Sequence, residues 1–527
     1  MRNFYNLRAI ALLLLAIGIG FRFVNLDQKV YWHDEVYTSL RVSGYTGEEV
    51  SQKLFNGEIV SPNRLLEFQT PSPDKTFSDT VNSLSQHPEH PPLYYLLVWG
   101  WWKLFGSSVA ATRGLSAVIS LLVFPSLYWL VLELTRSPRV GWYAIALVAI
   151  SPFHVLYAQE ARQYSLWTVA ILLSIASLLR AIRLNRIRDW AVYSITLALN
   201  FYTFLLSAFV AISHGIYAVV IAIRQRQFQI LWRFVLSGAI ALLLFSPWIA
   251  ILMARFSQFQ DKTYWTTVDE SSADLATQWT LHLSSIFIDL HPTVNARIAL
   301  FLLPILILAI TFNIYRVFRQ ESVPAGLLIS LLILIPALGL ILPDLILGGR
   351  RSSMSRYFIP CYLGIQLAVA YCIARLTRER HRRSRQFGQA IFAILITSGL
   401  ISSTISTNAE TWWNKVVSYN NSDIAKIVNA SDRPLIISHD YDINLGNLIS
   451  LAYELDAEVE FLLLQPSQIP PIPDRFSNIF TYNPSPKMRS RLERQTQATL
   501  VPIDNRGAKF WQLQLNSPPP SPSPTAD

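Results

Sequence analysis

Long apolar runs separated by short polar turns occupy most of the chain up to residue 406. A helix that crosses the hydrocarbon core of a bilayer needs roughly 20 apolar residues, and about eleven runs approach this length. They lie at residues 7–25, 110–133, 140–158, 164–182, 190–203, 205–223, 231–251, 297–315, 323–342, 357–376 and 388–406. The pattern predicts an α-helical polytopic membrane protein. Its first run is expected to be a retained span, since no small-x-small cleavage site follows it.

Arginine-rich turns between these runs predict the orientation of the spans, because cytoplasmic loops are enriched in Lys and Arg. The turns contain Arg136/Arg139, Arg180/Arg183/Arg186/Arg188, Arg224/Arg226/Arg233, Arg316/Arg319 and the segment 375–385. With a cytoplasmic N-terminus, all of them face the cytoplasm of a plasma (inner) membrane protein. Counting the apolar segment 90–105 as a span would reverse this result. Because it is rich in Tyr and Trp, we assign it as a juxtamembrane helix on the outer surface.

Three parts of the chain are then expected outside the membrane: the loops 26–109 and 252–296, and everything after residue 407. The last part contains "RPLIIS" (433–438), "VEFLLL" (459–464) and "NIFTY" (478–482), which are typical of strands, and a helical pattern at 444–455. We expect a small extracytoplasmic α/β domain with a mostly parallel sheet. The predicted divisions are a transmembrane domain at 1–407, the α/β domain at 408–516 and a disordered Pro/Ser-rich tail at 517–527.

The composition agrees with membrane insertion, and the two cysteines are not expected to form a disulfide. The chain is 52% hydrophobic and 15% charged, with a net charge of +10. An excess of basic residues can indicate a nucleic-acid partner, but here it is explained by the cytoplasmic turns, so no nucleic acid is expected. Cys361 and Cys372 share one apolar run and would lie roughly 16 Å apart on a helix, too far for a disulfide.

Six arginines and one acid fall at the predicted outer ends of four separate segments. They are Arg22, Arg113, Arg162, Arg350, Arg351 and Arg356, with Glu160. Any one of these side chains is readily explained as reaching for the lipid headgroups. Seven at one depth favour a common site instead. Guanidinium groups make paired hydrogen bonds to phosphate, so the cluster suits a lipid phosphate at the outer leaflet.

The outer loop adds a pair of adjacent carboxylates, Asp34 and Glu35, in "YWHDEVYTS", and a His/Pro-rich corner, "HPEHPP", with His87 and His90. The acidic pair alone is explained equally well as a solvated helix cap. A rigid corner in the same loop favours a site in which a reacting group is held in place. The pair could also bind a divalent ion, but no matched ligand set accompanies it, so no metal or other cofactor is assigned.

These segments together resemble a known enzyme family. "WHDE", "HPPLYYLLVWGWWKLFG", "YAQEARQYSL" and "SRYFIP", in this order over residues 7–376, are similar to the GT-C glycosyltransferases of the protein O-mannosyltransferase/aminoarabinose transferase superfamily (glycosyltransferase family 39-like). The resemblance implies that residues 1–407 form the catalytic domain. It also implies inverting transfer of a sugar from a polyprenyl or dolichyl phosphate to a lipid, glycan or protein acceptor outside.

The family motifs fall on specific residues of this chain. The catalytic acidic pair falls on Asp34 and Glu35, with Asp34 favoured as the base, and the basic residue before proline falls on His90. The Arg-Tyr pair falls on Arg356 and Tyr357. The set of candidate donor phosphate ligands is therefore Arg113, Arg162, Arg356, Tyr357 and His90, with Glu160, Tyr164, Arg22, Arg350 and Arg351 as further site candidates. A polar insertion near 60–88 makes the outer loop longer than is expected for the bacterial members, which bears on the acceptor.

A lipid or sugar-lipid transporter is the alternative, because it has similar composition and span number. That class is expected to place polar groups at the bilayer midplane and to show inverted repeats with broken helices. The sequence has Asn200 and His214 at moderate depth, but no carboxylate in the middle of a span and no repeat. The enzyme is therefore the favoured hypothesis.

Overall fold

The structure, a computed structural model, describes residues 2–290, 323–465, 469–503 and 509–515. The chain forms two compact units, each built from separate stretches of sequence. The first contains Met1–Gln28 and Val81–Ala409, and the second contains Lys29–Thr80 and Glu410–Asp527. The predicted domain boundary at 407 falls close to the end of the first unit. The prediction differs from the structure for residues 29–80, which pack with the C-terminal residues rather than with the transmembrane helices.

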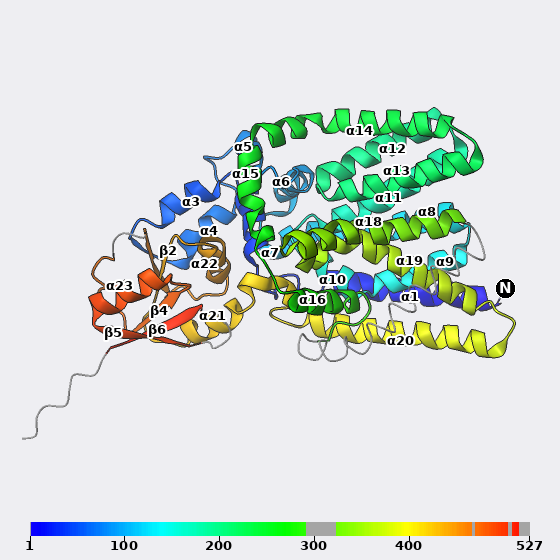
Figure 1. The fold of residues 1–527 in the computed structure, drawn as a ribbon. Coiled ribbons are helices and arrows are strands. Elements are labelled where there is room, and N and C mark those ends of the chain that lie inside the picture. The colour runs from blue at the N-terminus through cyan, green and yellow to red at the C-terminus, as the bar shows by residue number, and fades with distance from the viewer. Residues whose placement is uncertain (1, 291–322, 466–468, 504–508, 516–527) are drawn as a thin grey trace, which may run out of the picture. The chain divides into compact units, whose positions relative to one another are not determined.

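The first unit is a bundle of long apolar helices that run roughly parallel to one another (Figure 1). Its elements are α1 (Arg2–Phe23), α6 (Leu93–Phe105), α7 (Val109–Leu121), α8 (Val123–Thr135), α9 (Pro138–Ala149), α10 (Pro152–Ala158), α11 (Tyr164–Leu184), α12 (Ile187–Thr203), α13 (Ser207–Gln225), α14 (Gln229–Ala254), α15 (Phe256–Thr263), η2 (Tyr264–Thr267), α16 (Ser272–Ser284), α18 (Val323–Leu347), η3 (Arg351–Ser353), η4 (Ser355–Phe358), α19 (Ile359–Leu376) and α20 (Arg382–Thr407). Helix α5 (Phe77–Ser85) contains the boundary between the units.

Eight helices in the described residues are long and apolar enough to cross a membrane, and α9 with α10 makes a ninth if this pair, bent by 61°, is one span. The predicted run at 110–133 corresponds to α7 and α8, which pass the test as one segment, Val109–Thr135. The predicted span at 190–203 is α12. Its 17 residues are one fewer than the 18 required of a candidate membrane span. The predicted span at 297–315 lies outside the described residues. Helix α6 has only 13 residues, about 20 Å, which is too short to cross the bilayer.

The bend between α9 and α10 has a local cause in the sequence. Pro152 is the first residue of α10; its ring leaves no N–H to continue a helix and disfavours helical geometry at Ser151. The Ser151 hydroxyl donates instead to the carbonyl oxygen of Ile286 at 2.7 Å. Helix α1 packs against α9 just before the bend, where Gly18 has no side chain to separate the two backbones. A Cβ atom at Gly18 would lie 2.2 Å from the oxygen of Ala149.

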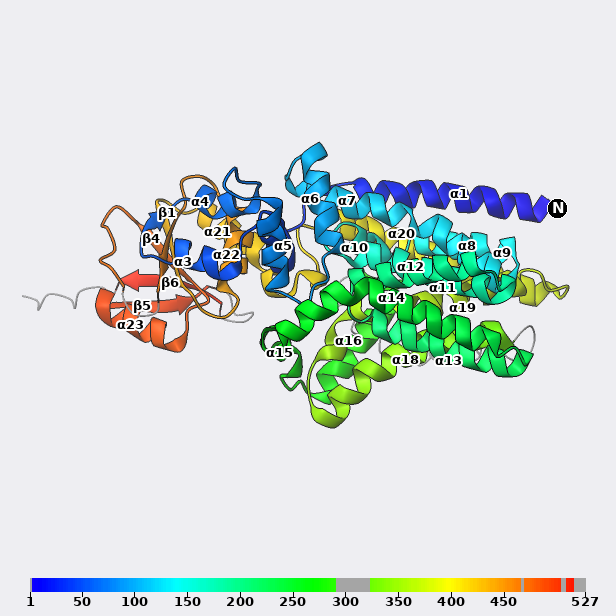
Figure 2. The same cartoon turned by 90° about the horizontal axis from the view of Figure 1, so that it is seen from above.

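The second unit combines helices with one mixed sheet. Its elements are α2 (His33–Val42), α3 (Gly47–Leu54), β1 (Ile59–Val60), α4 (Pro62–Leu66), η1 (Glu67–Gln69), η5 (Trp413–Ser418), α21 (Asn421–Asn429), β2 (Pro434–His439), α22 (Asn444–Ala452), β3 (Glu460–Leu464), β4 (Asn478–Tyr482), α23 (Pro486–Thr496), β5 (Ala498–Pro502) and β6 (Phe510–Leu515). The strand order is β1-β3-β2-β4-β6-β5, and Figure 2 shows β5 and β6 beside α23.

The expectation of a mostly parallel sheet is wrong for the edges of this sheet. The three strands predicted from the sequence, β3, β2 and β4, do pair in parallel at its centre. Strand β1 pairs antiparallel with β3, β6 pairs antiparallel with β4, and β5 pairs antiparallel with β6. Strand β6 follows β5 closely in the sequence and pairs antiparallel with both β5 and β4, whereas the connection from β4 to β5 contains α23.

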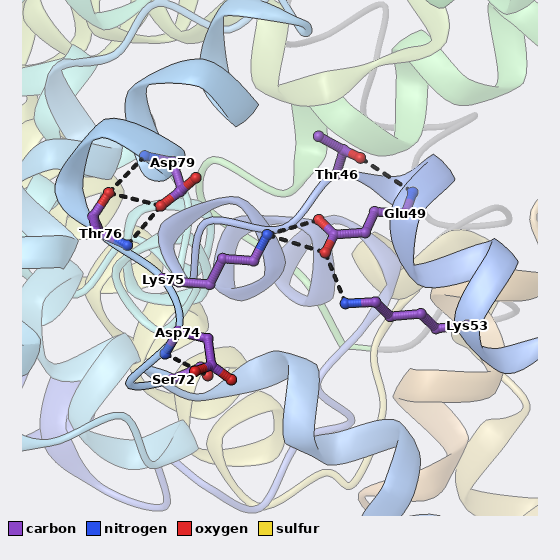
Figure 3. Close-up of polar contacts among 8 residues, drawn as sticks. All are labelled: Thr46, Glu49, Lys53, Ser72, Asp74, Lys75, Thr76 and Asp79. Atoms are coloured by element: carbon purple, nitrogen blue, oxygen red, sulfur yellow. Dashed lines mark hydrogen bonds and ion pairs between the residues drawn. The ribbon is translucent and has the colours of Figure 1, made fainter.

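The polar insertion predicted near residues 60–88 is ordered against α3. Lys75 donates to both carboxylate oxygens of Glu49, at 3.0 and 2.8 Å, and Lys53 donates to the same carboxylate at 2.8 Å (Figure 3). The ammonium of Lys75 also lies 4.5 Å from the centroid of the Tyr45 ring. Thr46 caps α3 by accepting from the Glu49 N–H. The insertion is thus tied to α3 by a defined ion pair within the second unit.

Candidate functional site

Most predicted site residues of the first unit gather at one end of the bundle, where α1 and α10 end and where α7, α11 and α19 begin. Gln159, after α10, donates to the carbonyl oxygens of Phe21 and Val24 at 2.8 and 2.7 Å. The Ser116 hydroxyl of α7 donates to the carbonyl oxygen of Arg162 at 3.3 Å. These bonds connect the ends of three helices, so the end of the bundle is a common polar layer.

Arg22 lies in this layer with its guanidinium bonded to main-chain oxygens. It is 1% exposed and donates to Gly18, Ala149 and Val148 at 2.7, 2.6 and 3.2 Å. The last carbonyl groups of α9 have no partner within their own helix because α9 stops at the bend. An unsatisfied carbonyl is costly inside a bilayer, so Arg22 stabilises the broken helix. This geometry describes a structural residue rather than a ligand for phosphate.

Arg113 and Arg162 are both buried, at 1% and 2% exposure. Arg113 donates to the carbonyl oxygen of Leu26 at 2.8 Å, and thereby holds the chain that follows α1. Arg162 donates to the phenol oxygen of Tyr95 at 3.1 Å. The Tyr95 ring lies 6.1 Å from the His90 ring, so Arg162 and His90 share one aromatic neighbour. Glu160, two residues before Arg162, is fully buried in the same turn.

The His/Pro-rich corner is built around an acid that the sequence analysis did not single out. Glu89 lies between His87 and His90, with oxygen–nitrogen distances of 3.4 and 3.7 Å. The indole N–H of Trp248 donates to the carbonyl oxygen of Pro88 at 3.1 Å and ties the corner to α14. His90 therefore has an acidic neighbour on one side and Tyr95 on the other.

Arg356 lies before α19 with an aromatic ring on each side. Its guanidinium carbon is 5.8 Å from the ring centroid of Tyr164 and 5.8 Å from that of Tyr357, and the residue is 8% exposed. Ser355, its neighbour, is hydrogen-bonded to Tyr157 at 3.0 Å. The charge of Arg356 also acts on His282 of α16. Burial lowers the pKa of the His282 imidazole to about 3, and the positive charge of Arg356 adds to this effect. His282 is therefore neutral at physiological pH.

The two arginines of the "GGRRSS" turn have carboxylate neighbours of their own. Arg351 donates to Asp344 at 2.9 Å, and the N–H and hydroxyl of Ser352 donate to the other oxygen of that carboxylate. Arg350 lies 3.6 Å from Glu270. A carboxylate beside each guanidinium offsets part of its positive charge, which makes Arg350 and Arg351 weaker candidates for phosphate ligands.

The acidic pair belongs to the second unit, at the start of α2, and the structure separates its two members. Asp34 is partly exposed. Glu35 is fully buried, pairs with Lys415 at 3.1 Å and accepts the main-chain N–H of Trp32 at 3.4 Å. Glu35 is thus paired within the second unit, and Asp34 on the same helix is partly exposed.

Among the candidates of the first unit, the structure places His90 and Arg162 beside Tyr95, and it places Arg356 beside Tyr164 and Tyr357. Arg22, Arg350 and Arg351 each have a separate set of partners. Within the described residues, no group of three or more His, Cys, Asp or Glu side chains is placed to hold a metal ion. The sequence analysis missed Glu89, Tyr95, His282 and Lys415. Only Glu89 and Tyr95 carried a signal, since both lie in the quoted "HPEHPPLYY" stretch.

Comparisons with known proteins identify a similar family and similar folds. A family model described as dolichyl-phosphate-mannose-protein mannosyltransferase matches residues 89–251, which include His90, Arg113 and Arg162. No curated protein matches the chain. ArnT from Cupriavidus metallidurans bound to undecaprenyl phosphate has a similar structure, with a TM-score of 0.53, 12% identity, and coverage of 95% of this chain and 97% of that chain.

The apo state of the same ArnT gives a TM-score of 0.55 at 11% identity, with the same coverage. At such low identity the structural likeness establishes the fold. The chain is a multi-pass helical membrane protein with the GT-C fold and a small region of strands near its C-terminus. The fold and the family match together support its assignment to the GT-C/PMT-like superfamily of glycosyltransferases.

Proposed function

We propose that this protein moves a sugar from a polyprenyl-phosphate donor to an acceptor on the outer side of the membrane, with inversion. The observation that carries the proposal is Arg356, a buried guanidinium flanked by the rings of Tyr164 and Tyr357. A guanidinium presents paired donors that match phosphate oxygens, and burial strengthens the interaction. The ArnT of similar fold was solved with undecaprenyl phosphate, which is a ligand of this kind.

In the proposed reaction, Asp34 acts as the general base. Its carboxylate accepts the proton of an acceptor hydroxyl while that oxygen attacks the anomeric carbon of the sugar. The bond between the anomeric carbon and the phosphate oxygen breaks on the opposite face, which inverts the configuration, and the bonding pair leaves with the lipid phosphate. General-base assistance of this type is typically worth about 10²- to 10⁴-fold in rate.

The leaving phosphate gains negative charge, so its ligands act most strongly as the bond breaks. We assign this role to Arg356 and Arg162, with His90 and Tyr357 as supporting ligands. One preorganised donor is worth roughly 3–4 kcal/mol by analogy with oxyanion holes. Arg113 is proposed as a further phosphate ligand and Tyr164 as a further site residue. The polar insertion with the second unit is proposed to contact the acceptor. The N-terminus is proposed to be cytoplasmic, in the plasma (inner) membrane.

A divalent ion was a possible further component, and the acidic pair was its candidate site. The Glu35 carboxylate bonds to Lys415 and to the Trp32 N–H, so the pair does not present two carboxylates to an ion. The residues at this position therefore do not fit a two-carboxylate metal site. No step of the proposed mechanism passes through a metal.

The test is incubation of the purified full-length protein with radiolabelled polyprenyl phosphate sugars and membrane extracts, followed by solvent fractionation of the products. Asp34→Asn should abolish transfer, while Asp27→Asn, an equal change at an exposed residue seven positions earlier, should leave it unchanged. Near wild-type turnover in Asp34→Asn would remove Asp34 from the mechanism. Failure of the wild-type protein to transfer label from any donor would count against the whole proposal.

A further inference from the structure

The helix that carries Asp34 is held by residues from the C-terminal part of the chain. Main-chain N–H of Val30 donates to the carbonyl oxygen of Glu410 at 2.8 Å, just before α2 begins. Helix α2 packs against α22, and Gly446 of α22 comes so close to the His33 ring that a Cβ atom there would lie 2.5 Å from its Nδ1. All of these contacts lie within the second unit.

The two neighbours of Asp34 in the sequence are both fixed by one short element, η5. The N–H of His33 donates to the hydroxyl of Ser418 at 3.0 Å, and that hydroxyl donates on to Asn447 at 2.7 Å. The Glu35 carboxylate pairs with Lys415 at 3.1 Å. Asp34 therefore sits between two residues whose positions are set by η5, about 380 positions away in the sequence.

The Lys415–Glu35 pair is costly to bury, so its retention calls for a reason other than stability. The two side chains are 1% and 0% exposed, and the Lys415 ammonium lies 5.9 Å from the ring centroid of Trp32. Well-packed apolar residues are often as stabilising as a buried ion pair, whereas an ion pair fixes one geometry. A pair directly beside Asp34 fixes the geometry of the first turn of α2.

The backbone of η5 gives a second, independent observation. Val416, the residue after Lys415, has φ of 36° and ψ of −96°. A β-branched side chain rarely adopts a positive φ, and such strain persists where the surrounding structure holds it in place, often at functional sites. The strained turn presents Lys415 and Ser418 to the same helix start.

We infer that Lys415 and Ser418 are positioning residues for Asp34, so that the C-terminal segment of the second unit completes the catalytic apparatus. This inference rests on the proposed function, in which Asp34 is the base. Neither residue touches the reacting atoms. Their role is to hold the first turn of α2 so that the Asp34 carboxylate keeps a single orientation.

The experiment uses purified full-length protein and two readouts, turnover and hydrogen exchange of peptides from α2. Lys415→Met should lower kcat about 100-fold, the loss expected when a reacting group is displaced by about 1 Å. The affinity for a non-transferable polyprenyl phosphate analogue should stay within about twofold, since the donor ligands lie on other elements. Exchange in residues 33–42 should become faster, while exchange in β2 and β3 stays the same.

The matched control is Lys426→Met, which removes a lysine of the same unit from an exposed pair with Glu410. It should change neither readout. Ser418→Ala should lower kcat about fivefold, as expected for the loss of one hydrogen bond. It also serves as the deciding variant if Lys415→Met does not fold.

The double variant Glu35→Gln/Lys415→Met separates tethering from the damage done by an unpaired buried carboxylate. It removes both charges together, so its stability should recover relative to Lys415→Met, because no charge is left unpaired. Its kcat should stay low, because the tether is absent. Recovery of kcat to near the wild-type value, or unchanged α2 exchange in both Lys415→Met and Ser418→Ala, would overturn the inference. The exchange readout needs no transfer activity, so it fails or succeeds independently of the proposed reaction.

Discussion

The guanidinium of Arg22 donates a 2.6 Å hydrogen bond to the carbonyl oxygen of Ala149, the last residue of α9. Sequence depth alone grouped Arg22 with the candidate phosphate ligands. The bond shows a different role, because it satisfies a carbonyl that the bend before Pro152 leaves without a helical partner. An arginine at a membrane depth suited to phosphate is therefore not enough to define a ligand. The hydrogen-bond partners of its N–H groups decide whether such an arginine is a candidate phosphate ligand.

Replacing Arg22 is expected to reduce stability while donor affinity is retained. Hydrogen bonds in membrane proteins average about 0.6 kcal/mol, and an unsatisfied buried carbonyl costs roughly 1–3 kcal/mol. Arg22→Met should therefore lower the free energy of unfolding by about 1–3 kcal/mol. Thermal unfolding in detergent, followed by size exclusion, measures this loss. Arg383→Met, at an exposed position of α20, is the control. Lost donor affinity in folded Arg22→Met would return Arg22 to the phosphate site.

Arg356 should behave in the opposite way. Arg356→Ala removes one charge-assisted interaction with the donor phosphate, worth roughly 1.5–3 kcal/mol, which corresponds to about 10- to 150-fold in affinity. Lysine should rescue it only in part, because a point charge does not reproduce paired guanidinium contacts. Binding of a non-transferable polyprenyl phosphate analogue to each purified variant is the measurement. Arg351→Ala, next to Asp344, should have a smaller effect on affinity. A larger loss of donor affinity in Arg351→Ala than in Arg356→Ala would exchange the roles of these two arginines.

The sequence predicted those parts of the fold that rest on local pattern. Apolar runs predicted the described long helices, and three short apolar stretches predicted β2, β3 and β4 within a residue or two. The short α6 agrees with its assignment as a helix that does not cross the bilayer. Strands β5 and β6 were missed, because their half-polar faces do not stand out from a loop and their pairing is decided by the neighbouring strand.

Long-range partners were beyond prediction for a different reason. Lys415 lies 380 residues from Glu35, and nothing in a basic residue of the "WWNKVV" stretch marks it as buried. Likewise, Glu270 lies beside Arg350, which belongs to a distant segment of the chain. Residue type and depth identify candidate charges, whereas the fold determines which charges are already paired.

The contact between the insertion and α3 should depend on pH. Burial alone would raise the pKa of Glu49, but hydrogen bonds and charges from Lys53 and Lys75 outweigh it and lower the pKa below 4.5. A lowered folded-state pKa gives stability that is complete above the unfolded value and is lost as the pH falls through the folded value. The protection of residues 70–80 against hydrogen exchange, taken relative to the intrinsic exchange rate at each pH, should therefore be high at pH 7 and lower below about pH 4.

Three variants make this test specific to Glu49. Asp79 also has a lowered pKa, owing to hydrogen bonds from Thr76, so its titration at acidic pH must be separated from that of Glu49. Glu49→Gln should therefore show fast exchange at pH 7 and a reduced pH dependence. Lys75→Met should resemble it, while Lys53→Met, which removes an i,i+4 pair within α3, should not. Equal effects of the two lysine variants would show that the insertion is held by other contacts.

The orientation in the membrane is the last prediction. Lys and Arg are enriched in cytoplasmic loops, and the segment 375–385 is the most basic turn of the chain. We expect this turn in the cytoplasm and residues 408–527 outside. Both native cysteines are replaced by alanine, since Cys361 is buried and Cys372 partly so, and a single cysteine is placed at the exposed Arg383 or Glu458. In intact cells a membrane-impermeant thiol reagent should label Glu458→Cys but not Arg383→Cys, which should react only after permeabilisation. Labelling of Arg383→Cys in intact cells would show that the orientation is the reverse of the one predicted. Arg356 would then lie at the cytoplasmic face, where a lipid-linked donor would have no need to cross the membrane.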